Sequence, residues 1–125
     1  MIAYSTIGAN DLSRSKVFYD PIIAALGGAV IDAYTDETHV WYGRERTGFL
    51  VLIKPHDGQP ATHGNGAMLA LSALSHAKVR EVHAIALKMG AANEGDPGFR
   101  TAPFYGAYFR DPDGNKICAF AMTEG

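Results

Sequence analysis

Tyr108-Phe109-Arg110-Asp111-Pro112-Asp113-Gly114-Asn115-Lys116-Ile117-Cys118-Ala119-Phe120 is the stretch in which turn chemistry and strand patterning agree throughout. Pro112 presets φ for the second position of a turn, and Asp113-Gly114 supplies residues that tolerate positive φ. The flanking runs are aromatic and β-branched, which is typical of strands. The stretch therefore predicts a β-hairpin. Side chains alternate along its second strand, so one face of the sheet carries Lys116, Cys118 and Phe120.

Length and composition describe one domain of 125 residues with an ordinary core, because 47% of the residues are hydrophobic and 19% are charged. The net charge of −2 provides no basic field for nucleic acid. Cys118 is the only cysteine, which excludes an internal disulfide and suits a reducing compartment. No leader or membrane-spanning run is recognisable, and we therefore expect a soluble cytoplasmic protein without nucleic-acid or membrane partners.

The predicted elements follow the order β-α-β-β-β twice. The first half has strands near 2–9, 29–34, 39–43 and 49–54, with a helix from Leu12 that Asn10-Asp11 caps and Gly27-Gly28 ends. Pro21 lies inside this helix and predicts a kink or a break. The second half has a strand at 67–73 and a helix from Ser75 to Gly90. A poorly patterned loop at 91–103, with room for one short strand, comes next, followed by a strand at 104–110 and the end of the hairpin.

Pro and Gly are concentrated between these halves, at 55–66. We therefore predict a single domain, 1–125, made of module 1 (about 1–54), a linker (55–66) and module 2 (about 67–125).

Four motifs together resemble the vicinal oxygen chelate superfamily, which includes glyoxalases, bleomycin- and fosfomycin-resistance proteins and extradiol dioxygenases. The motifs are the Asp-Pro-Asp-Gly-Asn turn, the strand-to-helix entry at 6–12, the linker sequences at 57–61 and 64–66, and the helix at 79–87. The resemblance, closest to a bacterial glyoxalase-like branch, implies an α+β fold. In that fold two βαβββ modules form a curved mixed sheet around a cleft, with helices on the outside, usually in a homodimer.

The resemblance also implies a divalent metal held by His and Glu side chains, but this chain departs from that pattern. The three matching positions carry Tyr4, Met68 and Cys118. A phenol, a thioether and a thiol lack the donors that hold a hard or borderline cation. We therefore expect no metal and no cofactor. The alternative is a soft ion such as Cu(I), with the sulfur atoms of Met68 and Cys118 as its ligands.

The five histidines do not supply a metal site in place of these residues. His76 and His83 are seven residues apart on the second predicted helix, without an accompanying carboxylate. We expect His83 to be a packed helix residue and His39 to be an exposed strand residue. The other two, His56 and His63, lie in the linker.

The same resemblance implies a ligand-binding cleft lined by Tyr4, Met68, Tyr108, Cys118 and Phe120. Trp41 belongs either to this cleft or to the core. Arg110 at the rim is a candidate for binding an anionic group or a solvated residue at the end of a strand. Such a lining suits a small apolar or aromatic molecule.

Three functions follow from these predictions. The leading one is a protein that binds a small molecule, as bleomycin-resistance proteins do, without the metal of the superfamily. The second is a metal-independent enzyme of the lyase or isomerase type that uses Tyr4 or Tyr108 as an acid or Cys118 as a nucleophile. The third is a non-catalytic structural dimer module. A buried, unreactive Cys118 is the alternative to the nucleophile.

Overall fold

The computed structural model describes all residues, 1–125, and has eight strands and two α-helices. In the first half these are β1 (Tyr4–Gly8), α1 (Leu12–Ala25), β2 (Ala29–Val30), β3 (His39–Gly43) and β4 (Phe49–Ile53), with a short 3-10 helix at Asp32–Tyr34. In the second half they are β5 (Leu69–Ser72), α2 (His76–Lys88), β6 (Ala92–Phe99), β7 (Tyr105–Arg110) and β8 (Lys116–Ala121). The order is β-α-β-β-β in both halves, which are called module 1 and module 2 below.

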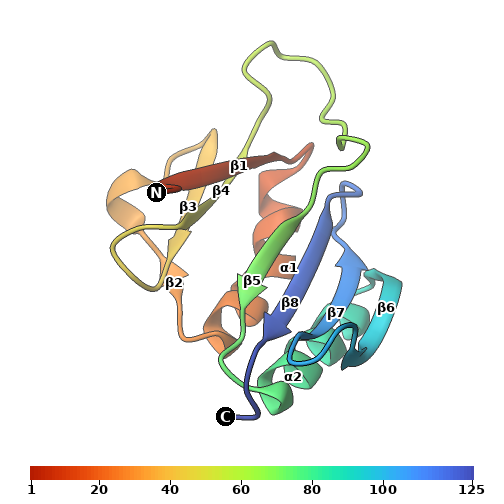
Figure 1. Ribbon diagram of the computed structural model, residues 1–125. Coiled ribbons are helices and arrows are strands. Elements are labelled where there is room, and N and C mark those ends of the chain that lie inside the picture. Colours follow the sequence, from red (N-terminus) through yellow and green to blue (C-terminus); the bar gives the residue numbers. More distant parts are fainter.

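Each module forms its own four-stranded mixed sheet (Figure 1). The first sheet has the order β1-β4-β3-β2 and the second sheet β5-β8-β7-β6. β1 runs parallel to β4, and β5 runs parallel to β8, whereas the other neighbours are antiparallel. The predicted α+β class and the repeated module order are confirmed. The eight strands form two sheets, because no strand of one module pairs with a strand of the other.

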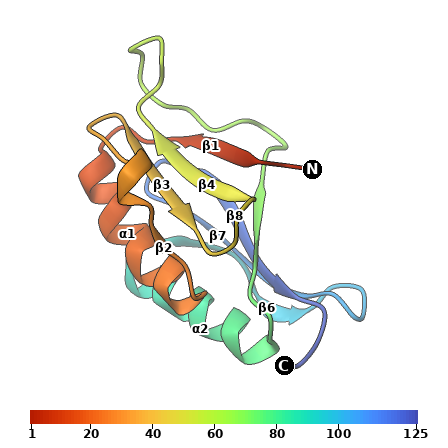
Figure 2. The same cartoon turned by 90° about the vertical axis from the view of Figure 1, so that its left-hand side faces the viewer.

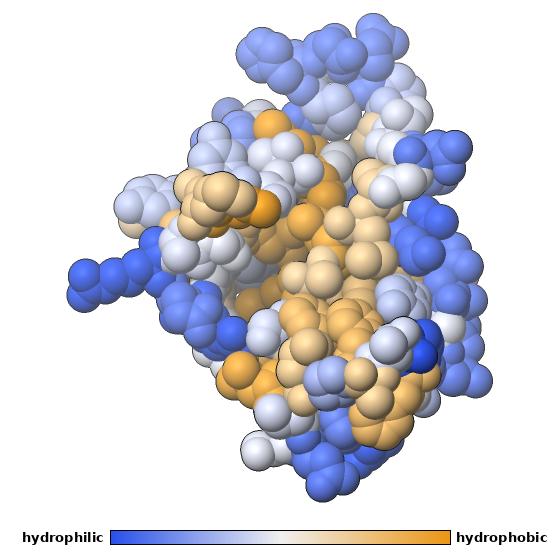
Figure 3. Space-filling view, in the orientation of Figure 1, coloured by the Kyte–Doolittle hydropathy of each residue, from blue (hydrophilic) through white to orange (hydrophobic).

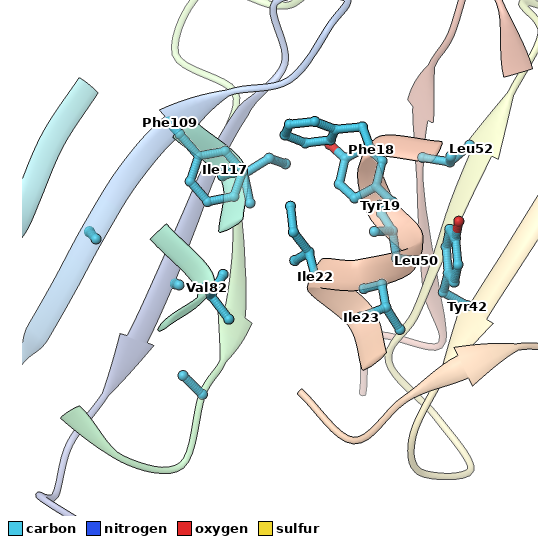
Figure 4. Close-up of a cluster of buried hydrophobic side chains, with 14 of the residues drawn as sticks. Phe18, Tyr19, Ile22, Ile23, Tyr42, Leu50, Leu52, Val82, Phe109 and Ile117 are labelled. Atoms are coloured by element: carbon cyan, nitrogen blue, oxygen red, sulfur yellow. The ribbon is translucent and has the colours of Figure 1, made fainter. Parts of the chain in front are cut away.

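The helices cover one face of each sheet, and both modules share one hydrophobic core (Figures 1 and 2). Figure 4 shows α1 with buried side chains of the first sheet on one side and of the second sheet on the other. The rings of Phe18 on α1 and Phe109 on β7 have centroids 6.1 Å apart. We call the face of each sheet that carries no helix its outer face. No helix is long and apolar enough to cross a membrane.

Helix α1 runs through Pro21, where the sequence predicted a kink or a break. Proline in a helix interior removes one hydrogen bond and costs about 3 kcal/mol. Tyr19 and Ile22 on either side are completely buried, and burying such side chains contributes roughly 1.5–3 kcal/mol each. Packing therefore holds the helix together across the proline. Its predicted cap is confirmed, because the carboxylate of Asp11 accepts a hydrogen bond from the Arg14 backbone N–H.

Two other boundaries differ from the prediction. The strand expected at 29–34 is only two residues long and is followed by the 3-10 helix. The loop expected at 91–103 contains β6, an eight-residue strand. Its pairing with β7 shifts register twice, between Asn93 and Gly95 and between Gly95 and Gly98. Such irregularities disrupt the alternation of side chains by which a strand is recognised in a sequence.

The closing hairpin is confirmed, and the structure decides which face of it is buried. Ile117 and Ala119 point into the core, and both are completely buried. Lys116, Cys118 and Phe120 therefore lie on the outer face of the second sheet.

The turn of this hairpin is bonded to module 1. The Tyr19 hydroxyl donates to the Asp111 carboxylate at 2.6 Å, and the Ser15 hydroxyl donates to the Asp113 carboxylate at 3.0 Å. The Asn115 side chain donates to the backbone oxygen of Gly8 at 3.0 Å. Burial and Asp111 raise the pKa of Tyr19 well above its ordinary value. The stretch that predicted a hairpin thus also holds the two modules together.

Candidate functional site

The predicted site residues lie on the outer faces of both sheets. Tyr4 on β1 and Trp41 on β3 belong to the first sheet, where they flank Phe49 and Val51 of β4. The second sheet carries the others. They are Met68 directly before β5, Tyr108 and Arg110 on β7, and Cys118 and Phe120 on β8. The structure therefore divides the predicted lining between two surfaces, one from each module.

An aromatic cluster covers the outer face of the first sheet. The Trp41 ring centroid is 4.9 Å from that of Tyr4, 5.8 Å from that of Phe49 and 5.5 Å from that of Tyr34. Phe49 lies over Gly43, where an added Cβ would approach its ring to 2.6 Å. This cluster of four rings contains no Asp, Glu, Lys or Arg side chain. This surface suits an apolar or aromatic group.

On the outer face of the second sheet, two phenylalanine rings form a flat stack. The rings of Phe104 and Phe120 are 5.2 Å apart and only 4° from parallel. Gly106 leaves the space that Phe104 occupies, because a Cβ there would approach its ring to 2.8 Å. Figure 3 shows apolar side chains gathered over β5 and β8 on this side of the molecule.

Next to this stack, two cations flank the ring of Tyr108. The Arg100 guanidinium carbon lies 5.0 Å from the ring centroid, and the Lys116 ammonium nitrogen lies 5.4 Å from it. Both distances are in the range of cation–π contacts. Tyr108 pairs with Cys118 across β7 and β8.

Cys118 is completely buried in the chain, although it faces outward. Burial raises the pKa of its thiol, and Tyr108 and Arg100 only partly oppose this effect. Burial also raises the pKa of Tyr108, with Cys118 as the next cause. Both groups are therefore protonated at neutral pH. The thiol form makes Cys118 a poor nucleophile, and the raised pKa makes Tyr108 a weaker acid than an ordinary tyrosine.

Arg110, the predicted anion-binding residue, already has partners. Its guanidinium donates to the Glu94 carboxylate at 2.6 Å and to the backbone oxygen of Gly114 at 2.9 Å. The hydrogen bond and charge of Arg110 hold the pKa of Glu94 below its ordinary value. An anionic ligand would have to displace Glu94 to use this arginine.

The three positions of the superfamily's metal ligands do not form a donor set that fits its divalent metal. Tyr4 is 52% exposed and Met68 is 45% exposed, whereas Cys118 is completely buried. The chain has no group of three His, Cys, Asp or Glu side chains that could hold a metal ion. His83 instead bonds to the amide oxygen of Asn93 at 3.0 Å, and His76 stacks on Tyr105 at 4.1 Å.

The main hollows of the molecule do not coincide with the aromatic surfaces of the outer faces. One of about 230 Å³ opens between the two sheets, near the middle of the face in Figure 3, and Tyr42, Leu50 and Leu71 help to line it. Met68 lines another of about 150 Å³. The five main hollows are lined by none of the remaining predicted site residues.

The sequence prediction missed three residues of these surfaces, namely Tyr34, Phe49 and Arg100, whereas alternation along the strand had placed Phe104 on the same side as Tyr108. Tyr34 and Phe49 were assigned only to strands, although Gly43, on which the Phe49 ring lies, was a signal for that ring. Arg100 follows the irregular strand β6, so alternation gave no indication of its position.

Comparison with known proteins agrees with this architecture. Residues 1–119 match the family model of the Glyoxalase/Bleomycin resistance protein/Dioxygenase superfamily. A solved glyoxalase/bleomycin resistance protein from Albidiferax ferrireducens is 39% identical, with a TM-score of 0.85 over 100% of this chain and 99% of that one. No functionally curated protein matches the chain.

A lactoylglutathione lyase from Agrobacterium tumefaciens is similar in fold alone. It is 21% identical, with a TM-score of 0.66 over 96% of this chain and 92% of that one. The chain belongs to the glyoxalase/bleomycin resistance protein/dioxygenase superfamily.

Proposed function

We propose that this protein binds a small planar apolar or aromatic molecule on the outer faces of its sheets, without the metal of its superfamily. The flat stack of Phe104 and Phe120 is the observation that carries the proposal. Two parallel rings held against a sheet provide a rigid surface on which a planar molecule stacks. The cluster around Trp41 provides a second such surface.

We also propose that a second copy of the chain completes the cleft. Each outer face is a single wall, whereas small-molecule sites usually enclose most of the ligand. The outer face of the first sheet of one copy, placed opposite that of the second sheet of its partner, would supply two aromatic walls. A homodimer is also what the family resemblance implied.

Metal-dependent lyase or dioxygenase chemistry has no support from the residues at the ligand positions. Tyr4, Met68 and Cys118 offer a phenol, a thioether and a protonated thiol to a cation that prefers imidazole and carboxylate. Binding alone requires only the aromatic walls. No observation favours the metal-independent enzyme, because burial raises the pKa of both Tyr108 and Cys118.

Thermal unfolding in the presence of planar hydrophobic metabolites tests the proposal. A ligand at about 100 times its Kd stabilises a protein by roughly 2.7 kcal/mol, which corresponds to a shift of several degrees for a domain of this size. Trp41 is the only tryptophan and lies on the first sheet. Quenching of its fluorescence by the ligand would report on that face.

Phe120→Ala should weaken binding about tenfold, as expected when one stacking ring is removed. Phe99→Ala is the matched control, because Phe99 is exposed and pairs with Tyr105, whose side chain is in the core. Equal loss in both variants, or no binding by any probe, would contradict the proposal. Absence of binding by every probe, in a protein that forms a stable dimer, would favour a structural dimer module.

A further inference from the structure

We propose that the ligand carries one negative charge on its planar aromatic framework, as an aromatic carboxylate does, and that Arg100 and Lys116 bind this charge beside Tyr108. The inference rests on the proposed function and specifies the class of its ligand.

Both cations are held at one ring. The centroid of Tyr108 is 5.0 Å from the guanidinium carbon of Arg100 and 5.4 Å from the ammonium nitrogen of Lys116. Cys118 is the cross-strand neighbour of Tyr108 on the same face. A cation over an aromatic ring keeps its full charge and is attracted only by the quadrupole of the ring. The two positive charges are therefore available to an anion.

Neither cation has a carboxylate partner. Arg100 donates to the backbone oxygens of Asp96 and Gly98, at 2.8 and 3.0 Å, and these acceptors are neutral. Lys116 takes part in none of the six ion pairs of the chain. Glu94 is close enough to feel the charge of Lys116, but it is bonded to Arg110.

The backbone leaves room for this arrangement at Gly95. A Cβ added there would lie 2.8 Å from the Tyr108 ring and 2.9 Å from a guanidinium nitrogen of Arg100. Real Cβ atoms do not approach so closely, so this position of β6 has to be glycine for both side chains to lie as they do. A side chain at this position would therefore displace the Tyr108 ring or the end of the Arg100 side chain, which lie together here.

Charge and shape together define the ligand class. The stacked rings of Phe104 and Phe120 suit a planar apolar framework, and the cations on the same sheet favour an anionic group on that framework. The aromatic cluster of the first sheet adds no charge of either sign. A cationic ligand would meet two like charges, and a neutral one would leave them without a partner.

Three probes with one ring system and different charges test this inference by calorimetry. They are naphthoate (negative), naphthamide (neutral) and naphthylmethylammonium (positive). Naphthoate should bind about tenfold more tightly than naphthamide, as expected for one added charge-assisted contact at a partly exposed site. Its advantage should shrink as salt is added, because salt screens exposed charges.

The double variant Arg100→Gln/Lys116→Met should bind naphthoate and naphthamide equally, whereas Lys88→Met should keep the preference. Lys88 lies on α2, and its substitution removes one positive charge at a position away from the outer face. Equal affinity of the native protein for the two probes would overturn the inference, as would a preference that survives the double variant. In both cases the proposed function would stand, whereas failure of all three probes to bind would overturn both.

Discussion

The two modules share a strand order, but their hairpin turns join the molecule together in different ways. The turn between β7 and β8 places Asp113, with a side chain 2% exposed, against the start of α1. The loop between β3 and β4 places Arg44 at the other end of α1. Its guanidinium donates to the backbone oxygens of Leu26 and Ser72, both at 3.1 Å. The connection between the last two strands thus carries a buried acidic network in module 2 and a single, partly exposed arginine in module 1.

The outer faces differ in the same manner. The outer face of module 1 is aromatic, whereas that of module 2 combines aromatic rings with a thiol, the Arg110–Glu94 ion pair and two cations without a carboxylate partner. Repetition of the fold therefore does not repeat the chemistry. The backbone order sets where a side chain points, and the individual residue decides what it can bind.

Asp113→Ala should have the largest effect on this comparison, lowering the free energy of unfolding by about 2–4 kcal/mol. The substitution leaves the Ser15 hydroxyl and the backbone and side-chain N–H groups of Asn10 without their acceptor. Urea denaturation of both proteins measures the change. Asp57→Ala, in the exposed linker, is the control and should change stability by less than about 0.5 kcal/mol. A loss as small as that of the control for Asp113→Ala would show that the turn does not hold the modules together.

The Cys118 thiol should react with iodoacetamide at least about tenfold more slowly than glutathione at pH 8. Only the thiolate reacts, and burial raises the pKa of this thiol, so less thiolate is present at any pH below that value. The rate should still be rising with pH at the ordinary thiol pKa of about 8.5 and level off only above it, as followed by mass spectrometry. A rate that levels off below pH 8 would indicate an activated cysteine and revive the enzyme hypothesis.

Arg44→Ala should cost less than Asp113→Ala, about 1 kcal/mol. The arginine side chain is 26% exposed, and the two oxygens that it leaves can bond to water. The same urea series measures it. A loss as large as that of Asp113→Ala would mean that the two modules are held equally at both ends of α1.

Cys118→Val should have the smallest effect, with a loss below about 1 kcal/mol. The corresponding third position of β4 carries Val51, which is also completely buried and outside the shared core. The variant would therefore have the same side chain at this position of module 2 as module 1 has at the equivalent position. A loss above about 2 kcal/mol would show that the two positions are packed differently.

Local chemistry accounts for the parts of the fold that the sequence predicted. The hairpin at 108–120, the caps at Asp11 and Ser75 and the order of elements depend on residues close together in the chain. The sequence left a kink or a break at Pro21 open, and the structure has one helix there, because the compensating burial comes from the other module and from the sheets. Propensity describes a segment alone, whereas packing can override it.

The amino-acid sequence alone established the module order, the family resemblance and the identity of the side chains at the metal-ligand positions, because each depends on residue type and spacing. Only the tertiary structure decided that the candidate residues occupy two outer faces, that Arg110 is engaged by Glu94 and that Arg100 reaches Tyr108. The last two contacts cross between strands, and one of them depends on an irregular strand. Spacing along a chain cannot specify such contacts, because they arise only when distant segments pack together.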